Sequence, residues 1–138
     1  MPLSVGTNTA ATISMESSDE LSFATCSIDM RFEPKDVDHA IRMLRSVRGI
    51  IRAKRGCRAC EVGIEAFESG LVHYREEWES AESFHRHVRS EEFRRVLIAV
   101  DLCSEEPRIV VGTLSGHSGM EYLRKLREEG DKVRIANG

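Results

Sequence analysis

The sequence has no apolar run long enough to cross a membrane and no strong excess of either charge. Its densest apolar patch, residues 96–100, is far shorter than the roughly 20 residues that a spanning helix needs. The formal net charge of −3 is too small to favour a nucleic acid or a membrane surface as a partner. With 138 residues, of which 41% are hydrophobic, the chain has the composition of one ordinary soluble domain.

Basic residues are missing before Arg31, and the first 20 residues contain only isolated apolar ones. A secretory leader has a basic start and an apolar stretch, and a mitochondrial presequence is rich in arginine. We therefore expect a cytoplasmic protein. Serine and threonine dominate residues 1–20, which predicts a flexible N-terminal arm, with an arm that folds onto a partner subunit as the alternative.

Cysteine is scarce, and the four cysteines do not follow a metal-binding pattern. Cys57 and Cys60 are three residues apart, but a zinc site of this type needs a second pair at similar spacing, and the sequence has none. Cys60 also continues the inward face of an expected strand, where a free cysteine packs as a small apolar residue. We interpret both as structural thiols, with redox or metal use as the alternative.

The first half of the chain alternates between strand-like and helix-like hydrophobic patterns. Residues 21–32 alternate apolar and polar side chains, as a half-buried strand does. From Pro34 the apolar residues recur at helical spacing, and Gly56 closes this helical region. Two further strands are expected over residues 60–66 and 71–78, with a turn signal between them.

The second half contains two short helices that begin after the capping residues Ser80 and Ser90, a strand over residues 109–114 and a last helix that stops near Gly130. The order strand-helix-strand-strand-helix-strand predicts an α+β, ferredoxin-like domain with an extra C-terminal helix. Its four antiparallel strands would carry helices on one face. We expect apolar groups on the other face and a second copy that covers them, which gives a homodimer.

The residues best suited to chemistry lie within residues 70–97. Tyr74, Glu76 and Trp78 share one face of the third expected strand, so a phenol, a carboxylate and an indole would lie beside the next helix. Apolar walls with a few convergent polar groups are typical of a small-molecule pocket. The alternative is that Tyr74 and Trp78 belong to the core and Glu76 to its rim.

His85 and His87 place two imidazoles on the short helix after Trp78. An imidazole titrates close to neutral pH and can act as a general base, although either residue could equally be a boundary or surface histidine. Two residues apart on a helix, they cannot bind one metal ion together. On a helical wheel His85 lies nearer the apolar stripe, so periodicity predicts that His85 is the buried one.

These residues resemble the antibiotic biosynthesis monooxygenase family, whose members form dimeric α/β barrels. The resemblance rests on Glu76-x-Trp78, Ser83-Phe84-x-x-His87-Val88, Ser90-x-x-Phe93, Pro107 before the last strand, and Arg55-Gly56-Cys57 at the earlier turn. It covers about residues 21–128, which predicts a domain of that extent and a C-terminal tail over residues 129–138.

The resemblance implies a monooxygenase that works without a cofactor or metal and oxidises a small electron-rich aromatic, such as a quinol or an anthrone, with O₂. It favours His87 over His85 as the pocket-facing histidine. His87 is therefore the expected base, with Trp78 and Glu76 as the other catalytic residues. The expected substrate-binding residues are Tyr74, Phe84, Phe93 and Leu97.

One branch of the family degrades haem with an axial histidine and a tryptophan. In this sequence Leu97 matches the position of that axial histidine and His87 matches the position of that tryptophan, which speaks against haem degradation. Two further functions remain open: a non-catalytic homodimer that binds a small hydrophobic metabolite in the same pocket, and an RNA-binding module. The acidic segment at residues 75–79 opposes RNA, so we expect no nucleic-acid partner.

Overall fold

The computed structural model describes residues 20–117 and 119–137, and the chain divides into two compact units. The larger unit comprises residues 23–114 and contains every candidate site residue. The smaller unit comprises residues up to 22 and from 115 onward. No described helix is both long enough and apolar enough to cross a membrane.

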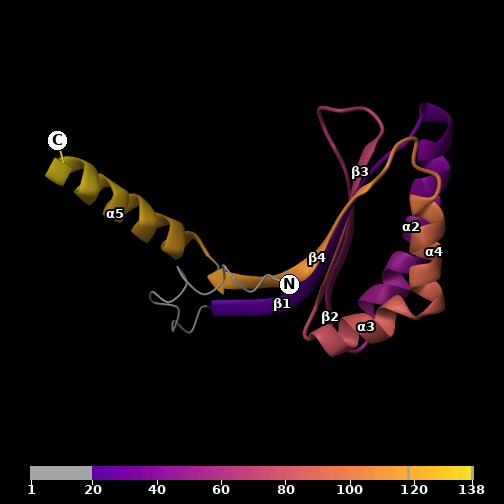
Figure 1. Ribbon diagram of the computed structural model, residues 1–138, viewed down its shortest axis with the longest axis horizontal. Helices are drawn as coiled ribbons and strands as arrows, with labels where there is room; N and C mark the ends of the chain where they lie inside the picture. Colours follow the sequence, from indigo (N-terminus) through magenta and orange to yellow (C-terminus); the bar gives the residue numbers. More distant parts are fainter. Residues whose placement is uncertain (1–19, 118, 138) are drawn as a thin grey trace. The chain divides into compact units, whose positions relative to one another are not determined.

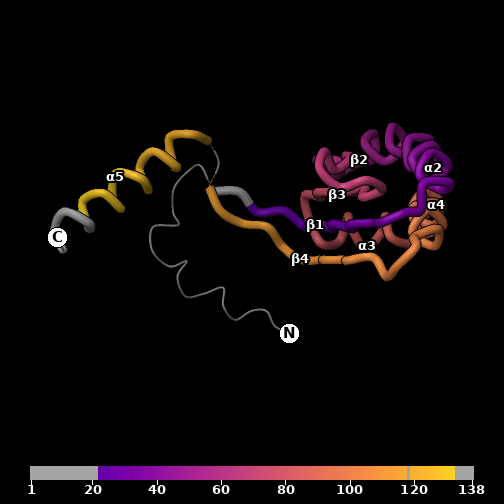
Figure 2. Tube along the Cα trace, turned by 90° about the horizontal axis from the view of Figure 1, so that it is seen from above, coloured from indigo at the N-terminus to yellow at the C-terminus, as the bar shows by residue number. Residues whose placement is uncertain are grey.

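The elements follow the expected order (Figure 1). They are β1 (Glu20–Arg31), α2 (Pro34–Arg52), β2 (Cys57–Ile64), β3 (Leu71–Trp78), α3 (Ala81–Val88), α4 (Glu91–Val100), β4 (Arg108–His117) and α5 (Met120–Asn137). The four strands form one sheet in the order β2-β3-β1-β4, with β3 antiparallel to both β1 and β2 and with β4 beside β1 (Figure 2). Helices α2, α3 and α4 lie on one side of this sheet. The predicted ferredoxin-like α+β fold is confirmed.

The core lies between the sheet and the helices. Strand β1 supplies alternate residues, and α2 supplies residues three or four positions apart, as the two periodicities predict. The buried residues of these two elements are Ala24, Cys26, Ile28, Met30, Ala40, Leu44, Val47 and Ile51, and Phe32, directly after β1, is buried with them. Strand β3 adds Val72, Tyr74, Glu76 and Trp78, so a carboxylate is enclosed by the core.

Both short helices begin at the predicted serine caps. Ser80 Oγ accepts a hydrogen bond from the backbone N–H of Ser83 at 3.1 Å, and Ser90 Oγ accepts one from Phe93 at 3.2 Å. Each cap satisfies an amide that has no partner within the helix and stabilises it by about 1 kcal/mol. Because Ser80 follows Trp78 so closely, its cap fixes where α3 leaves the sheet.

Several predicted boundaries shift. Strand β2 starts at Cys57 and ends at Ile64, and β4 continues to His117. Helix α5 passes through Gly130 to Asn137, so the predicted helix stop near Gly130 is wrong. One glycine inside a helix costs only about 1 kcal/mol, which good helix formers on both sides can offset. The predicted arm lies outside the described residues except at Glu20, and the predicted domain bounds remain a prediction.

The sheet face that the helices leave uncovered is more polar than predicted on its central strands. His73 of β3 lies there, with its ring 2.8 Å from Asp29 Oδ1 and 2.9 Å from Glu65 Oε1. Exposed aliphatic side chains occur instead on the edge strand β4, where Val110 is 49% and Leu114 46% exposed. The apolar area expected to attract a second copy is therefore on β4 rather than across the sheet.

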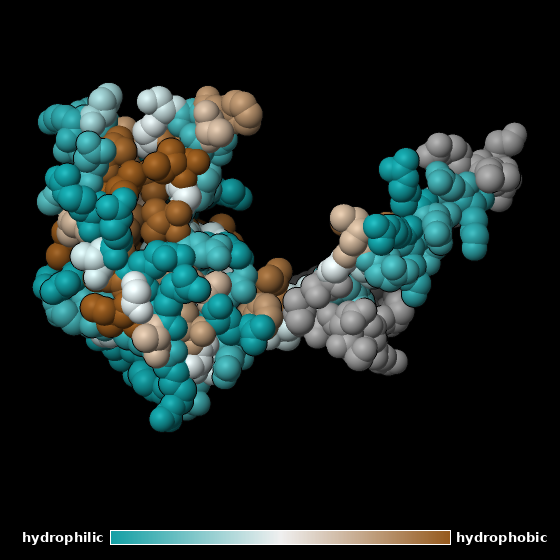
Figure 3. Space-filling model, turned by 180° about the vertical axis from the view of Figure 1, so that it is seen from behind, coloured by the Kyte–Doolittle hydropathy of each residue, from teal (hydrophilic) through white to brown (hydrophobic). Residues whose placement is uncertain are grey.

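Other large apolar side chains are also exposed in the larger unit. On the face drawn in Figure 3, hydrophobic residues of this unit gather in a patch that hydrophilic residues border. Phe67, in the turn between β2 and β3, is 93% exposed, and Ile64 at the end of β2 is 65% exposed. The end of this hairpin is thus more apolar than a turn that only meets water.

Candidate functional site

Helix α3, with the two residues after it, lies between two cavities. Phe84, His85 and Val88 line one of them, whereas Ser83, Arg86 and His87 line the other. At 3.6 residues per turn these two sets occupy opposite halves of the helix. The helix therefore separates a cavity lined mostly by apolar side chains from one lined mostly by basic and polar side chains.

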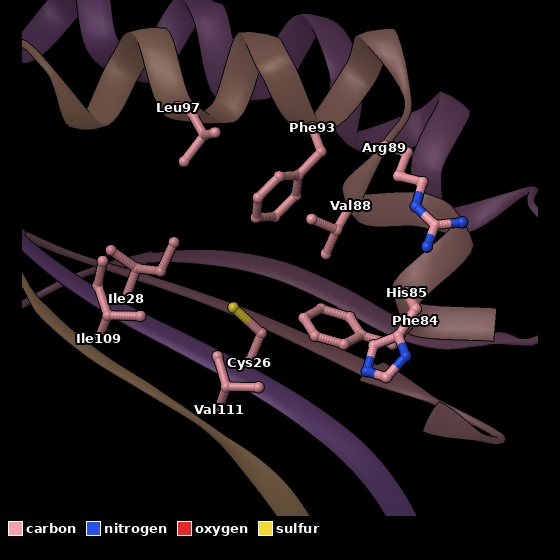
Figure 4. A pocket seen from close by; sticks show the side chains of 10 residues that line it. All are labelled: Cys26, Ile28, Phe84, His85, Val88, Arg89, Phe93, Leu97, Ile109 and Val111. Atoms are coloured by element: carbon pink, nitrogen blue, oxygen red, sulfur yellow. The ribbon is translucent and has the colours of Figure 1, made fainter. Parts of the chain in front are cut away.

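The first cavity, the apolar pocket, has a volume of about 430 Å³ and lies between β1, β4, α3 and α4 (Figure 4). Its lining residues are Cys26, Ile28, Phe84, His85, Val88, Arg89, Phe93, Leu97, Ile109 and Val111. Two of these, His85 and Arg89, are polar, and Figure 4 places both at the same end of the pocket.

Behind α3 a buried polar cluster is centred on Glu76, which has no exposed surface. Its carboxylate accepts hydrogen bonds from the Tyr74 hydroxyl, from Trp78 Nε1 at 2.8 Å and from His87 Nε2 at 2.9 Å. A carboxylate can be buried at low cost only when it is paired in this way. Burial, followed by the Glu76 charge, raises the pKa of Tyr74, so its hydroxyl stays protonated and donates.

His87 is held from both sides and is only 2% exposed. Lys54 Nζ lies 3.1 Å from its Nδ1 and also binds Glu92 Oε1 at 2.8 Å. A neutral imidazole that donates from Nε2 and accepts at Nδ1 satisfies both Glu76 and Lys54. The Trp78 ring stacks on the His87 ring with 4.6 Å between the ring centroids. The Phe93 ring contacts the His87 ring edge-on, with 5.3 Å between the centroids.

The antibiotic biosynthesis monooxygenase family model matches residues 24–97, which is more than half of the 138-residue chain. The chain belongs to this family. The match begins in β1 and ends in α4, so it includes the buried cluster and most of the apolar pocket. No curated protein sequence matches the chain.

Several solved structures have a similar fold. A conserved protein from Methanosarcina mazei Go1 is 20% identical, with a TM-score of 0.60 over 66% of this chain and 90% of that chain. A structure described as an antibiotic biosynthesis monooxygenase is 17% identical, with a TM-score of 0.57 over 64% and 94%. A protein from Mycobacterium tuberculosis is 18% identical, with a TM-score of 0.59 over 72% and 99%. At these identities the likeness concerns the fold.

Within this family fold, the residues predicted for the site form two separate groups. Phe84, Phe93 and Leu97 line the apolar pocket. Tyr74, Glu76, Trp78 and His87 form the buried cluster, and none of these four lines that pocket. Trp78 and His87 line the second cavity instead. The catalytic roles predicted for His87, Trp78 and Glu76 remain predictions.

The two histidines of α3 are the reverse of what periodicity predicted. His87 is buried, whereas His85 is exposed and lines the apolar pocket. The helical wheel failed because the stripe of Phe84 and Val88 faces a cavity rather than the closed core. The side of α3 that packs on β3 is the side of His87, where a carboxylate compensates for its polarity.

Cys57 and Cys60 are free thiols at the start of β2. Burial raises the pKa of Cys60 to about 11 and also raises the pKa of Cys57. Because the thiolate is the reactive form, this favours the structural interpretation of both thiols. Among the described residues, no group of three or more His, Cys, Asp or Glu side chains is placed to hold a metal ion.

Sequence reasoning missed the polar groups that accompany each cavity. Arg89 lines the apolar pocket, and Lys54 and Ser90 contact the ring of His87. The signal for Arg89 was its position one helical turn after His85, directly after the end of α3. No local pattern relates Lys54 to His87, because 33 residues separate them.

Proposed function

We propose that the protein is a monooxygenase that oxidises a small electron-rich aromatic, of the quinol or anthrone kind, with O₂ and without a cofactor. The observation that carries this proposal is the apolar pocket, with hydrophobic walls and with His85 and Arg89 together at one end. Its volume of about 430 Å³ is roughly three times that of a cavity that takes up benzene, so two or three fused rings fit.

The reaction begins when the substrate, written RH₂, loses a proton. His85 accepts this proton because it is the imidazole on the pocket wall, and the Arg89 guanidinium stabilises the substrate anion. The anion gives one electron to O₂, and the substrate radical and superoxide combine into a peroxide that takes back the proton. Cleavage of the O–O bond, with loss of the second hydrogen from the same carbon, leaves a carbonyl and water. RH₂ and O₂ thus give R=O and H₂O.

The buried cluster has a positioning role in this proposal. Glu76 fixes the ring of His87, and His87 contacts Phe93 edge-on at 5.3 Å. Phe93 lines the apolar pocket, so the cluster supports one of its walls from behind. His87, Glu76 and Trp78 therefore act through the pocket's shape, whereas the family resemblance implies that His87 is the base.

Oxygen uptake separates these two assignments. An oxygen electrode would compare the wild type with His85→Ala, His87→Ala and His39→Ala on a panel of hydroquinones and anthrones, above the uncatalysed rate. We expect His85→Ala to lower kcat/KM by about 10²–10⁴-fold. His39 is an exposed residue of α2, and its variant serves as the unchanged control.

Wild-type rates in His85→Ala, together with loss of turnover in a folded His87→Ala, would transfer the role of the base to His87. Uptake that never exceeds the uncatalysed rate with any substrate would contradict the oxygenase. The same substrates would then be used only as ligands.

A non-catalytic binder of small hydrophobic metabolites is the alternative, and one observation favours it. No hydrogen bond from a described residue orients the His85 ring, whereas catalytic bases are commonly oriented by a third group. In this case both 1-naphthol and hydroquinones would raise the melting temperature, and neither would cause O₂ uptake above the uncatalysed rate.

We also propose a cytoplasmic homodimer. All four thiols are free, which fits a reducing compartment. The exposed Val110 and Leu114 of β4 supply apolar area for a second copy. Light scattering coupled to gel filtration should give twice the chain mass, and Val110→Lys with Leu114→Lys should halve it. A wild-type protein that elutes as a monomer at every concentration would contradict the dimer.

A further inference from the structure

We propose that the second cavity, on the opposite side of α3, binds a small anion that carries a phosphate group. This basic cavity has a volume of about 360 Å³. It is lined by Lys54, Arg55, Trp78, Ser83, Arg86, His87 and Ser90. The proposal does not depend on the oxygenase, because Arg55 and Arg86 do not line the apolar pocket.

Permanent positive charges converge on this cavity from two segments of the chain. Lys54 and Arg55 follow α2, and Arg86 belongs to α3. Lys54 pairs with Glu92, while in the part of the chain that the structure describes neither Arg55 nor Arg86 forms an ion pair. Three positive charges against one negative charge leave an excess of two. A phosphate monoester carries about −1.5 to −2 at pH 7 and is the matching ligand.

The dipole of α2 explains only part of this charge. Cations at the carboxyl end of a helix are favourable in themselves, which accounts for Lys54 and Arg55 as ordinary surface residues. It does not account for Arg86, which comes from another helix and lines the same cavity. An arginine fork also binds phosphate oxygens in a bidentate manner that a solvated charge does not require.

Hydroxyl groups complement these cations. Ser80 Oγ donates to Ser83 Oγ at 3.1 Å, so the proton of the Ser83 hydroxyl is available for another acceptor. Ser90 Oγ accepts the Phe93 amide and lies 3.4 Å from His87 Nδ1. A phosphate in the cavity would therefore meet guanidinium, ammonium and hydroxyl donors together, as phosphate sites do.

The two segments that form the cavity are locked together by Gly56. Its φ of +88° is unfavourable for other residues, and a Cβ there would lie 2.6 Å from Ser83 Oγ. The Glu79 amide also donates to the Gly56 carbonyl at 2.8 Å. The Lys54–Arg55 turn is thus fixed against the start of α3, and the charges are brought together before any ligand arrives.

Calorimetric titration with inorganic phosphate at constant ionic strength tests the proposal on the full chain. We expect one saturable site in the wild type and an affinity at least about tenfold lower in the double variant Arg55→Gln, Arg86→Gln. The matched control is Arg42→Gln, Arg45→Gln, which removes the same charge from exposed residues of α2. This control should keep the wild-type affinity, and far-UV circular dichroism should show all three proteins folded.

Three results would overturn the site. They are the absence of saturable binding in the wild type, an equal loss of affinity in both double variants, and acetate that binds as tightly as phosphate. The contact between Lys54 and His87 provides a second measurement. A bound phosphate competes with His87 Nδ1 for Lys54, so its addition should shift the ¹⁵N resonance of this nitrogen in the wild type.

Discussion

The buried cluster and the apolar pocket, which lie on opposite sides of α3, differ in how their polar side chains are satisfied. In the buried cluster Glu76 has three donors, and no buried side-chain nitrogen or oxygen in the described chain lacks a partner. In the apolar pocket the side chains of His85 and Arg89 have no hydrogen-bonding or ion-pair partner among the described residues. Satisfied buried groups contribute to stability, and unsatisfied groups at a cavity remain available for a ligand. The comparison assigns stability to the buried cluster and chemistry to the apolar pocket.

The largest effect that separates the two sides is expected for Glu76→Ala. It leaves the Tyr74, Trp78 and His87 donors buried without their acceptor, so the free energy of unfolding should fall by about 3–5 kcal/mol. Urea denaturation measures it. The control Glu61→Ala removes a carboxylate that is 60% exposed and should stay within about 0.5 kcal/mol of the wild type. If the free energy of unfolding of Glu76→Ala fell by less than about 1 kcal/mol, the buried cluster would not have the structural role assigned to it.

The opposite change, in the pocket, should affect binding and spare stability. Leu97 lines the pocket and is 43% exposed, so Leu97→Trp can fill the cavity without overpacking the core. We expect the affinity for 1-naphthol, measured by calorimetry, to fall by about tenfold, or about 1.4 kcal/mol. Ile50→Trp adds the same side chain at a similarly exposed position of α2 and is the control. Equal affinities in both variants would place the ligand elsewhere.

The fold was predictable from the sequence because its signals are local. Alternation identified β1 and β3 with their inward faces, and Ser80 and Ser90 identified the starts of α3 and α4. Gly130 failed as a stop signal because a single glycine is a weak one when helix formers surround it. Local patterns thus predicted the helices and strands correctly, and the differences from the structure lie mainly at the ends of these elements.

The site was predictable only in part. The resemblance drew attention to Glu76, Trp78 and His87, and the structure places these three together. Which histidine faces a cavity could not be read from α3 alone, because an apolar stripe can face either a closed core or an open pocket. The contact of Lys54 with His87 depends on how α2 ends against α3, which is a tertiary property.

A smaller effect is expected on the uncovered sheet face. The hydrogen bonds that His73 donates to Glu65 and Asp29 raise its pKa above the ordinary value of 6.5. The stabilisation is therefore complete below pH 6.5 and is lost as the pH rises through the higher pKa of the folded state. Because the His73 side chain is 42% exposed, we expect less than about 1 kcal/mol.

Urea denaturation on both sides of this range measures the His73 effect. His73→Asn should abolish that part of the pH dependence, and His39→Asn on α2 should preserve it. Identical pH profiles for the wild type and His73→Asn would show that these ion pairs contribute nothing to stability.

The smallest effect is expected at Cys57. It pairs with Trp78 across strands β2 and β3 but takes no part in the hydrogen bonds of the buried cluster. Its thiol is half-buried and its pKa is raised, so it is a poor thiolate. Cys57→Ser should therefore change the free energy of unfolding by less than about 0.5 kcal/mol under reducing conditions. Oxidised glutathione should leave all four thiols of the wild type titratable. Loss of two thiols in the wild type but none in Cys57→Ser would instead establish a redox pair with Cys60, and the stable side of α3 would then also carry chemistry.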